Sequence, residues 1–180
     1  MKPTRSTRSD HDPSLVIVYT DGACIGNPGP GGYGIVILHN GERRELSSGF
    51  RHTTNNRMEM LAAVVALENF GARARVLLHS DSRYVVDAIE KGWARKWKAN
   101  RWMRNAKEPA INPDLWERML TVVDLHDVRF QWVRGHAGNP ENERCDVLAT
   151  SAARRGGWPA DESYERGPSP HSAQRDMFGG

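Results

Sequence analysis

The sequence has very little cysteine and no long apolar run, and both absences limit what the protein can be. Cys24 and Cys145 are its 2 cysteines, and neither belongs to a CxxC or His/Cys ligand spacing. We therefore expect reduced thiols rather than a disulfide framework or a zinc site, so that any metal must bind oxygen ligands. No apolar run approaches the roughly 18 residues that span a bilayer, and residues 1–13 lack a signal-peptide core. These absences predict a cytoplasmic protein with no membrane partner.

The chain also has little room for more than one domain. Its 180 residues, 38% of them hydrophobic, are enough for one ordinary core. Both ends are rich in Ser, Pro, Gly and charge without periodicity, so residues 1–13 and 156–180 are predicted to be disordered. We expect a single domain over residues 14–155, acting as a monomer with no obligate protein partner.

Hydrophobic periodicity divides this domain into three strands followed by alternating helices and strands. The expected strands cover residues 15–20, 33–38, 43–50, 75–79 and 128–133. The expected helices cover residues 58–70, 82–90 and a segment around 115–122, and a last one begins at Asn139 and Pro140. Because the first three strands follow one another directly, they predict an antiparallel meander. The whole order predicts an α/β fold, a mixed five-stranded sheet with helices packed on both sides.

Four carboxylates lie at predicted strand ends or helix starts, where sheets of this kind bind ligands. Asp21 ends the first expected strand, Asp81 ends the fourth, and Glu59 and Asp146 lie near the starts of two helices. Each has a purely structural alternative, as a turn residue, a helix cap or a solvated helix residue. If they converge at the strand ends, however, their repulsion requires hard cations such as Mg²⁺ or Mn²⁺. Two such ions form a clamp for phosphoryl transfer, so the pattern indicates a nuclease.

A glycine-rich segment at residues 29–34 formally fits the GxGxxG pattern of dinucleotide-binding proteins. A strand follows it where that pattern demands a helix, so we reject a dinucleotide site. We interpret the segment as a turn between strands, whose small residues let Asn27 and the backbone approach a groove.

A basic stretch at residues 91–107 contains seven Lys and Arg residues, three Trp residues and no acidic residue. This composition is typical of a nucleic-acid-binding surface, whose affinity should fall steeply with salt. The alternative is that Trp93 and Trp97, spaced i and i+4, only dock the segment on the domain. The residues predicted to bind substrate here are Trp93, Lys96, Trp97, Lys98 and Trp102.

Three long strings are more specific than any of these short patterns. They are YTDGACIGNPGPGGYG at residues 19–34, TTNNRME at 53–59 and GHAGNPENERCD at 135–146, with Asp81 between the second and the third. Together they resemble the signatures of the bacterial ribonuclease HI family over about residues 14–155. The resemblance implies a ribonuclease H-like fold and an endonuclease that cuts the RNA strand of RNA/DNA hybrids. It also implies two Mg²⁺ ions during catalysis, for which Mn²⁺ can substitute.

The resemblance also assigns a role to individual residues. The implied metal ligands, which are also catalytic, are Asp21, Glu59, Asp81 and Asp146. His136, in a flexible loop, would support proton transfer or product release. The implied substrate contacts are Asn27, Asn55 and Asn56 in the minor groove, Thr54 and Asn112 at a DNA phosphate, and Cys24 and Glu59 near RNA hydroxyls. The stretch at 91–107 would be a basic protrusion that grips the DNA strand.

Water activated by metal would leave 3′-hydroxyl and 5′-phosphate ends, but the residues alone leave other functions open. Integrases, transposases and some exonucleases place acidic metal ligands on the same type of sheet. A non-catalytic hybrid-binding module would keep the basic stretch but could dispense with the carboxylates. A metal-free ribonuclease would need paired histidines, and the 7 histidines are scattered without an obvious pair.

Overall fold

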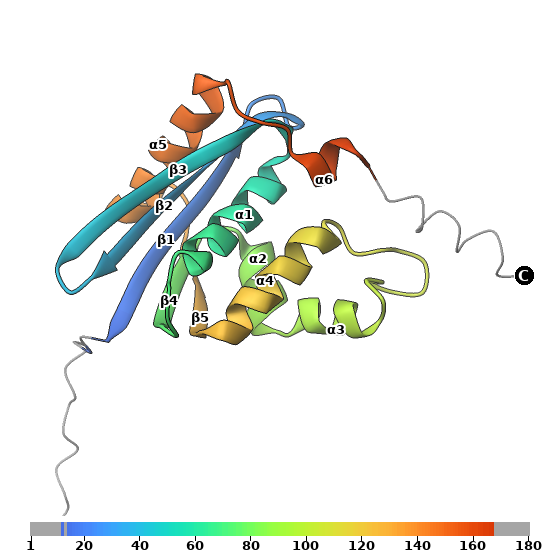
Figure 1. The fold of residues 1–180 in the computed structure, drawn as a ribbon, viewed down its shortest axis with the longest axis horizontal. Helices are drawn as coiled ribbons and strands as arrows, with labels where there is room; N and C mark the ends of the chain where they lie inside the picture. Colours follow the sequence, from blue (N-terminus) through green and yellow to red (C-terminus); the bar gives the residue numbers. More distant parts are fainter. Residues whose placement is uncertain (1–11, 13, 168–180) are drawn as a thin grey trace, which may run out of the picture.

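The computed structural model describes residue 12 and residues 14–167, which form one five-stranded sheet with helices on both faces (Figure 1). The strands are β1 (Leu15–Cys24), β2 (Gly29–His39), β3 (Glu42–Thr53), β4 (Arg75–Ser80) and β5 (Asp127–Trp132). Their order in the sheet is β3-β2-β1-β4-β5. β3, β2 and β1 pair antiparallel, whereas β1, β4 and β5 pair parallel. The predicted mixed sheet with an N-terminal meander is confirmed.

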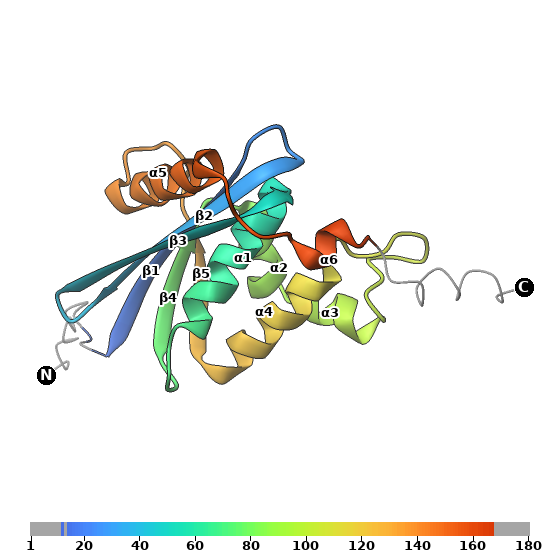
Figure 2. The same cartoon turned by 45° about the horizontal axis from the view of Figure 1, so that its top comes forward.

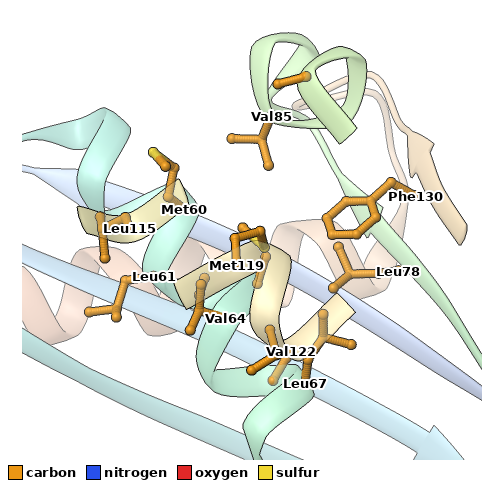
Figure 3. Packing of buried hydrophobic residues seen from close by; sticks show 14 of the residues in the cluster. Met60, Leu61, Val64, Leu67, Leu78, Val85, Leu115, Met119, Val122 and Phe130 are labelled. Carbon is orange, nitrogen blue, oxygen red and sulfur yellow. The ribbon is translucent and has the colours of Figure 1, made fainter. Parts of the chain in front are cut away.

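The helices divide into two layers, which both views show (Figures 1 and 2). They are α1 (Asn55–Glu68), α2 (Arg83–Glu90), α3 (Trp93–Ala99), α4 (Pro113–Leu125), α5 (Pro140–Arg155) and the short α6 (Glu162–Glu165). α5 covers the face of β1, β2 and β3 on one side, and the α1 to α4 group lies on the other. Figure 3 shows the core of this second side, where α1 and α4 pack against Leu78 of β4 and Phe130 of β5.

Helix starts follow the caps that the sequence offers, with one correction. Asn139 caps α5 as predicted, because its side-chain oxygen accepts hydrogen bonds from the N–H groups of Glu141 and Asn142. α1 was expected from residue 58 but begins at Asn55. Its cap is Thr54, whose hydroxyl accepts from the N–H of Arg57 at 3.2 Å.

The glycines of residues 29–34 lie in β2 itself and do not form a turn, so our interpretation of this segment was wrong. The small size of Gly32 and Gly34 instead lets α5 lie directly on the strand. A Cβ added to Gly32 would lie 2.5 Å from the carbonyl oxygen of Ala149, and one added to Gly34 would lie 2.2 Å from that of Cys145. Any larger side chain on this face of β2 would therefore push α5 away from the sheet.

Residues 156–167 differ from the disordered tail that we expected after residue 155. The indole Nε1–H of Trp158 donates to the carbonyl of Ala152 at 2.7 Å, and the N–H of Arg51 donates to the carbonyl of Pro159 at 2.9 Å. Asp161 is only 3% exposed. A few specific anchors thus hold a segment whose average composition is that of a disordered chain. The expected extension at residues 1–13, apart from Asp12, and the tail after 167 lie outside the described residues.

Candidate active site

Two of the four predicted carboxylates are neighbours because of the parallel register of the sheet. The last pair between β1 and β4 is Thr20 with Ser80, so Asp21 and Asp81 come next on adjacent strands. β4 ends there, whereas β1 continues to Cys24 beside β2 alone. We expected Asp21 to end its strand, but β1 continues past it. Asp21 instead lies at the point where β4 has ended and the sheet is open beside β1. This opening is the place that parallel sheets offer to ligands.

Glu59 reaches the same opening because Gly22 lets α1 approach β1. A Cβ added to Gly22 would lie 2.3 Å from the backbone nitrogen of Glu59 and 2.5 Å from the carbonyl carbon of Met58. The Glu59 carboxylate accepts a hydrogen bond from the Asn55 amide at 3.1 Å, which holds it in place. One ligand oxygen from each of Asp21, Glu59 and Asp81 lies within 4.8 Å of the others.

This close approach makes Gly22 a sensitive position. We expect Gly22→Ala to push the first turns of α1 off β1 and to separate Glu59 from Asp21, because both contacts of the new Cβ are with backbone. Hybrid cleavage should fall at least about tenfold, since displacements near 1 Å are enough for such losses. The check is activity together with the Mg²⁺-induced rise in melting temperature, beside Gly71→Ala, whose Cβ would meet nothing within 4 Å. Wild-type values for both readouts would contradict this account.

Burial and mutual repulsion disfavour the charged form of all three carboxylates. Burial raises the pKa of Asp21 to about 8, with further rises from the charges of Asp81, Glu59 and Asp146. Burial likewise raises the pKa of Glu59 to about 7, and the charge of Asp81 adds to this. The pKa of Asp81 is raised mainly by burial. At neutral pH such a group needs a nearby positive charge to be fully ionised, which is the condition that a divalent cation satisfies.

Asp146 and His136 frame this cluster from the other side. Asp146 is half-buried in α5 and lies outside the group of three, although its charge contributes to the raised pKa values of Asp21 and Asp81. His136 is exposed in the loop between β5 and α5, with a φ of 53°. The preceding residue touches the site, because a Cβ on Gly135 would lie 2.7 Å from Oδ2 of Asp81. The loop thus begins in contact with the cluster and carries its histidine into solvent.

The predicted groove residues form one connected surface beside the carboxylates. The N–H of Asn55 donates to the side-chain oxygen of Asn27 at 3.0 Å, and the Asn112 amide donates to that of Asn56 at 2.9 Å. The Cys24 thiol lies 3.4 Å from the carbonyl oxygens of Gly29 and Thr53, and its single S–H can donate to either of them. The first turn of α1, the end of β1 and the start of α4 therefore present these side chains together.

Some side chains of the basic stretch at residues 91–107 pack against the domain, and others are exposed. Trp97 is only 9% exposed, with its ring centroid 5.8 Å from that of Trp116, so the docking alternative describes this residue. Arg95 pairs with Asp124, and Lys98 pairs with Glu117, both acids coming from α4. Trp93 and Trp102 are partly buried against the core, and Lys96 is exposed. An open pocket of about 560 Å³ remains, lined by Tyr84, Trp93, Lys96, Trp97, Asn100, Met103, Arg104 and Asn105.

Sequence reasoning missed three buried polar residues around the site. Asn142 is 2% exposed and Arg57 3% exposed, and Asp161 comes from the segment that we expected to be disordered. Arg57 stands inside the TTNNRME string but was not singled out, because a helical arginine is normally solvated. Only its contacts, described below, reveal what it does. Asp161 carried no signal in the sequence.

A mixed sheet with carboxylates converging where β1 and β4 separate defines the ribonuclease H-like class of α/β proteins, and comparison with known proteins agrees. The RNase H family profile matches residues 13–154. The ribonuclease H of Desulforamulus reducens is 64% identical over 146 residues, covering 81% of this chain and 92% of its own. The ribonuclease HI of a Synechocystis species is 60% identical over 153 residues, covering 84% and 96%.

Solved structures give the same result. The chain resembles LC9-RNase H1, described as a type 1 RNase H with the type 2 active-site motif, with a TM-score of 0.69 and 35% identity over 93% of this chain and 87% of that one. It also resembles LC11-RNase H1, solved in complex with an RNA/DNA hybrid, with a TM-score of 0.60 and 25% identity over 78% and 97%. This chain belongs to the ribonuclease H family and is a ribonuclease H enzyme.

Within residue 12 and residues 14–167, no helix is long and apolar enough to cross a membrane.

Proposed function

We propose that this enzyme hydrolyses the RNA strand of RNA/DNA hybrids with two divalent cations, normally Mg²⁺, and leaves 3′-hydroxyl and 5′-phosphate ends. The observation that carries the proposal is the convergence of Asp21, Glu59 and Asp81 within 4.8 Å in a partly buried opening of the sheet. Membership of the family and the hybrid bound by LC11-RNase H1 support the choice of substrate. The site is proposed to act in a monomer in the cytoplasm.

The donor set fits hard cations. Oδ1 of Asp81 is buried and has no hydrogen-bond partner among the described residues, and Oδ1 of Asn142 is in the same situation. Buried oxygens are rarely left unpaired, and a buried carboxylate oxygen without a donor is compatible with a bound cation. Carboxylate and amide oxygens are the ligands that Mg²⁺ and Mn²⁺ prefer. Asp21, Glu59, Asp81 and Asp146 would hold the ions, which supply an activated water and neutralise the charge of the leaving oxygen.

The surrounding residues position the substrate for that chemistry. Asn27, Asn55 and Asn56 line the approach from the minor groove, where side-chain amides can contact base edges and 2′-hydroxyls. Thr54 and Asn112, at the starts of α1 and α4, would hold a DNA phosphate. The exposed Lys96 and the half-buried Trp93 and Trp102 would contact the DNA strand farther along α3 and its loop. His136, exposed on its loop, would take up or release a proton at the opening and so assist product departure.

The test is cleavage of a labelled hybrid beside matching duplex RNA and duplex DNA, with Mg²⁺, with Mn²⁺ and with EDTA. We expect cutting only in the RNA strand of the hybrid, no cutting with EDTA, and a loss of at least about 10³-fold in Asp81→Asn, because clamping of charge supplies most of the rate enhancement. End analysis should give 3′-hydroxyl and 5′-phosphate groups. The matched control is Asp127→Asn, at the opposite end of the neighbouring strand, which should cut normally.

Other outcomes would favour the other functions. Tight hybrid binding without cutting in any divalent cation would indicate a binding module. Cleavage of single-stranded RNA that resists EDTA would overturn the metal-dependent mechanism. Cutting or joining of duplex DNA would point to a strand-transfer enzyme or a deoxyribonuclease with the same sheet.

A further inference from the structure

Arg57 of α1 is a buried cation whose hydrogen-bonding capacity is completely used. A guanidinium has five N–H donors in a rigid plane and accepts nothing. Nε donates to Asp161 at 2.7 Å, and Nη2 donates to Asp161 at 2.9 Å and to Asp114 at 2.7 Å. Nη1 donates to Asp114 at 2.9 Å and to Oδ1 of Asn112 at 3.1 Å. Because every direction of the fork is occupied, this side chain cannot rotate without leaving a buried donor unpaired.

This saturation fixes the orientation of two neighbouring amides. Since Arg57 can only donate, the side chain of Asn112 must turn its oxygen toward it. The amide nitrogen of Asn112 then faces the other way and donates to Oδ1 of Asn56 at 2.9 Å. The Asn56 oxygen is thereby used, and the donor group that remains, its NH₂, has no partner among the described residues. The charge on Arg57 thus decides which end of the half-buried Asn56 faces outward.

The outer support of this chain of contacts is Asp161, in the segment that follows α5. Asp161 is 3% exposed and also accepts from the hydroxyl of Thr53 at 2.7 Å. Both views show the short α6, which begins directly after Asp161, beside the start of α4 (Figures 1 and 2). The 156–167 segment therefore closes the guanidinium site on the side away from Asn112, because Asp161 binds Nε and Nη2 whereas Asn112 binds Nη1. Without the Asp161 carboxylate, two donors of Arg57 would be buried and unpaired, which favours rotation of the fork.

We propose that Asp161 is a positioning residue for substrate: through Arg57 and Asn112 it holds Asn56 so that the NH₂ group of Asn56 faces hydrogen-bond acceptors in the minor groove of the hybrid. The inference rests on the proposed function. Purine N3 and pyrimidine O2 are acceptors that the minor groove presents at every base pair. A fixed donor at Asn56 therefore contacts the groove without selecting a sequence. A free amide would face the groove with its oxygen part of the time and would bind less well.

Asp161→Asn tests the proposal, since it keeps the shape but removes the charge that orients Arg57. We expect KM for the hybrid to rise roughly three- to tenfold with kcat unchanged, because binding is impaired and the metal site is not. The matched control is Glu165→Gln, which breaks the exposed pair of Glu165 with Arg51 in the same segment and should leave KM unchanged. All assays are run well below the melting temperature of each variant, which is measured in parallel.

A chemical change in the substrate separates positioning from general loosening. Replacing one purine at a time by its 3-deaza analogue removes the N3 acceptor, and at the position that Asn56 contacts it should raise KM for the wild type. In Asp161→Asn and in Asn56→Ala the same replacement should add little, and combining the two substitutions should be no worse than Asn56→Ala alone. Additive penalties at every position would overturn the proposal, as would lower stability with unchanged KM.

A second variant and a binding measurement cover the cases in which Asp161→Asn does not fold or the wild type does not cut. If Asp161→Asn does not fold, Thr53→Val removes one hydrogen bond to Asp161 and should raise KM in the same direction by a smaller factor. If the wild type binds hybrids but does not cut them, the proposed function fails, whereas the inference is still tested by measuring dissociation constants for the same variants and 3-deaza hybrids. A Thr53→Val protein with wild-type discrimination against the 3-deaza hybrids would contradict the inference.

Discussion

Asp21→Asn is expected to abolish cleavage and, at the same time, to stabilise the metal-free protein above neutral pH. Asp21 is 6% exposed, and its carboxylate stands beside two others. Its pKa is raised to about 8 by burial and by its acidic neighbours. An uncharged amide at this position removes both the burial of a charge and the repulsion. It also keeps an oxygen in place for the hydrogen bond from the N–H of Gly22 at 2.8 Å.

The direction of the pH dependence follows from where the proton is bound. Between about pH 4 and pH 8 the folded protein keeps a proton on Asp21 that the unfolded chain, with an ordinary aspartate pKa of 3.8, has lost. The free energy of unfolding therefore falls as pH rises through this interval and stays low above it. Asp21→Asn should show no gain below pH 4, a growing gain between pH 4 and 8, and above that a constant gain of at most about 6 kcal/mol, which is the full effect of raising this pKa from 3.8 to about 8.

Urea unfolding in EDTA at pH 4, 6 and 9 measures this difference directly. Asp127→Asn is the control, because Asp127 lies exposed at the far end of the neighbouring strands, away from the three carboxylates. Adding Mg²⁺ should stabilise the wild type more than Asp21→Asn, since the ions bind only the intact folded site. A variant that is less stable than wild type at pH 9 would show that the Asp21 charge is already compensated within the protein.

The sequence was sufficient for the sheet because the strand signals were local. Residues 15–20 and 75–79 are dominated by apolar and β-branched residues, and each corresponds to a strand of the structure. The convergence of Asp21 with Asp81 could also be anticipated from the rule that ligands bind where parallel strands end. The exact register, Thr20 with Ser80, could not, because it depends on packing between elements that are distant in the chain.

What escaped prediction depended on contacts across the fold. Trp97 lies in a stretch whose composition is typical of a nucleic-acid contact, and only the positions of α2 and α4 show that Tyr84 and Trp116 pack against it. Asp161 lies in a stretch rich in Pro, Gly and charged residues. The average composition of this stretch gives no sign that one of its residues has a buried partner. Arg57 lay within a string that we singled out, but its five acceptors come from distant parts of the chain. Such networks are tertiary and leave no periodic pattern.

The glycines of β2 determine the position of Asp146, the fourth carboxylate, because they set how closely α5 approaches the sheet. Gly34 pairs directly with Asp21 in the sheet, and α5 crosses over it. A Cβ at Gly34 would lie 2.2 Å from the carbonyl oxygen of Cys145 and 2.7 Å from Cβ of Leu148. Since neither atom belongs to the flexible end of a side chain, α5 itself has to move. Asp146, the residue after Cys145, would move with the helix and away from the cluster.

Gly34→Ala should therefore lower the free energy of unfolding by about 3 kcal/mol, as for a poorly tolerated overpacking change. It should also reduce cleavage at least about 10²-fold under conditions where the variant remains folded, because displacements near 1 Å are enough for such losses. Gly71→Ala is again the matched control, since open space surrounds that position. Circular dichroism during urea unfolding gives the stability, and single-turnover cleavage gives the activity. A variant that is destabilised but cuts the hybrid at the wild-type rate would mean that Asp146 tolerates movement of α5, and that the three carboxylates from β1, α1 and the end of β4 are sufficient for catalysis.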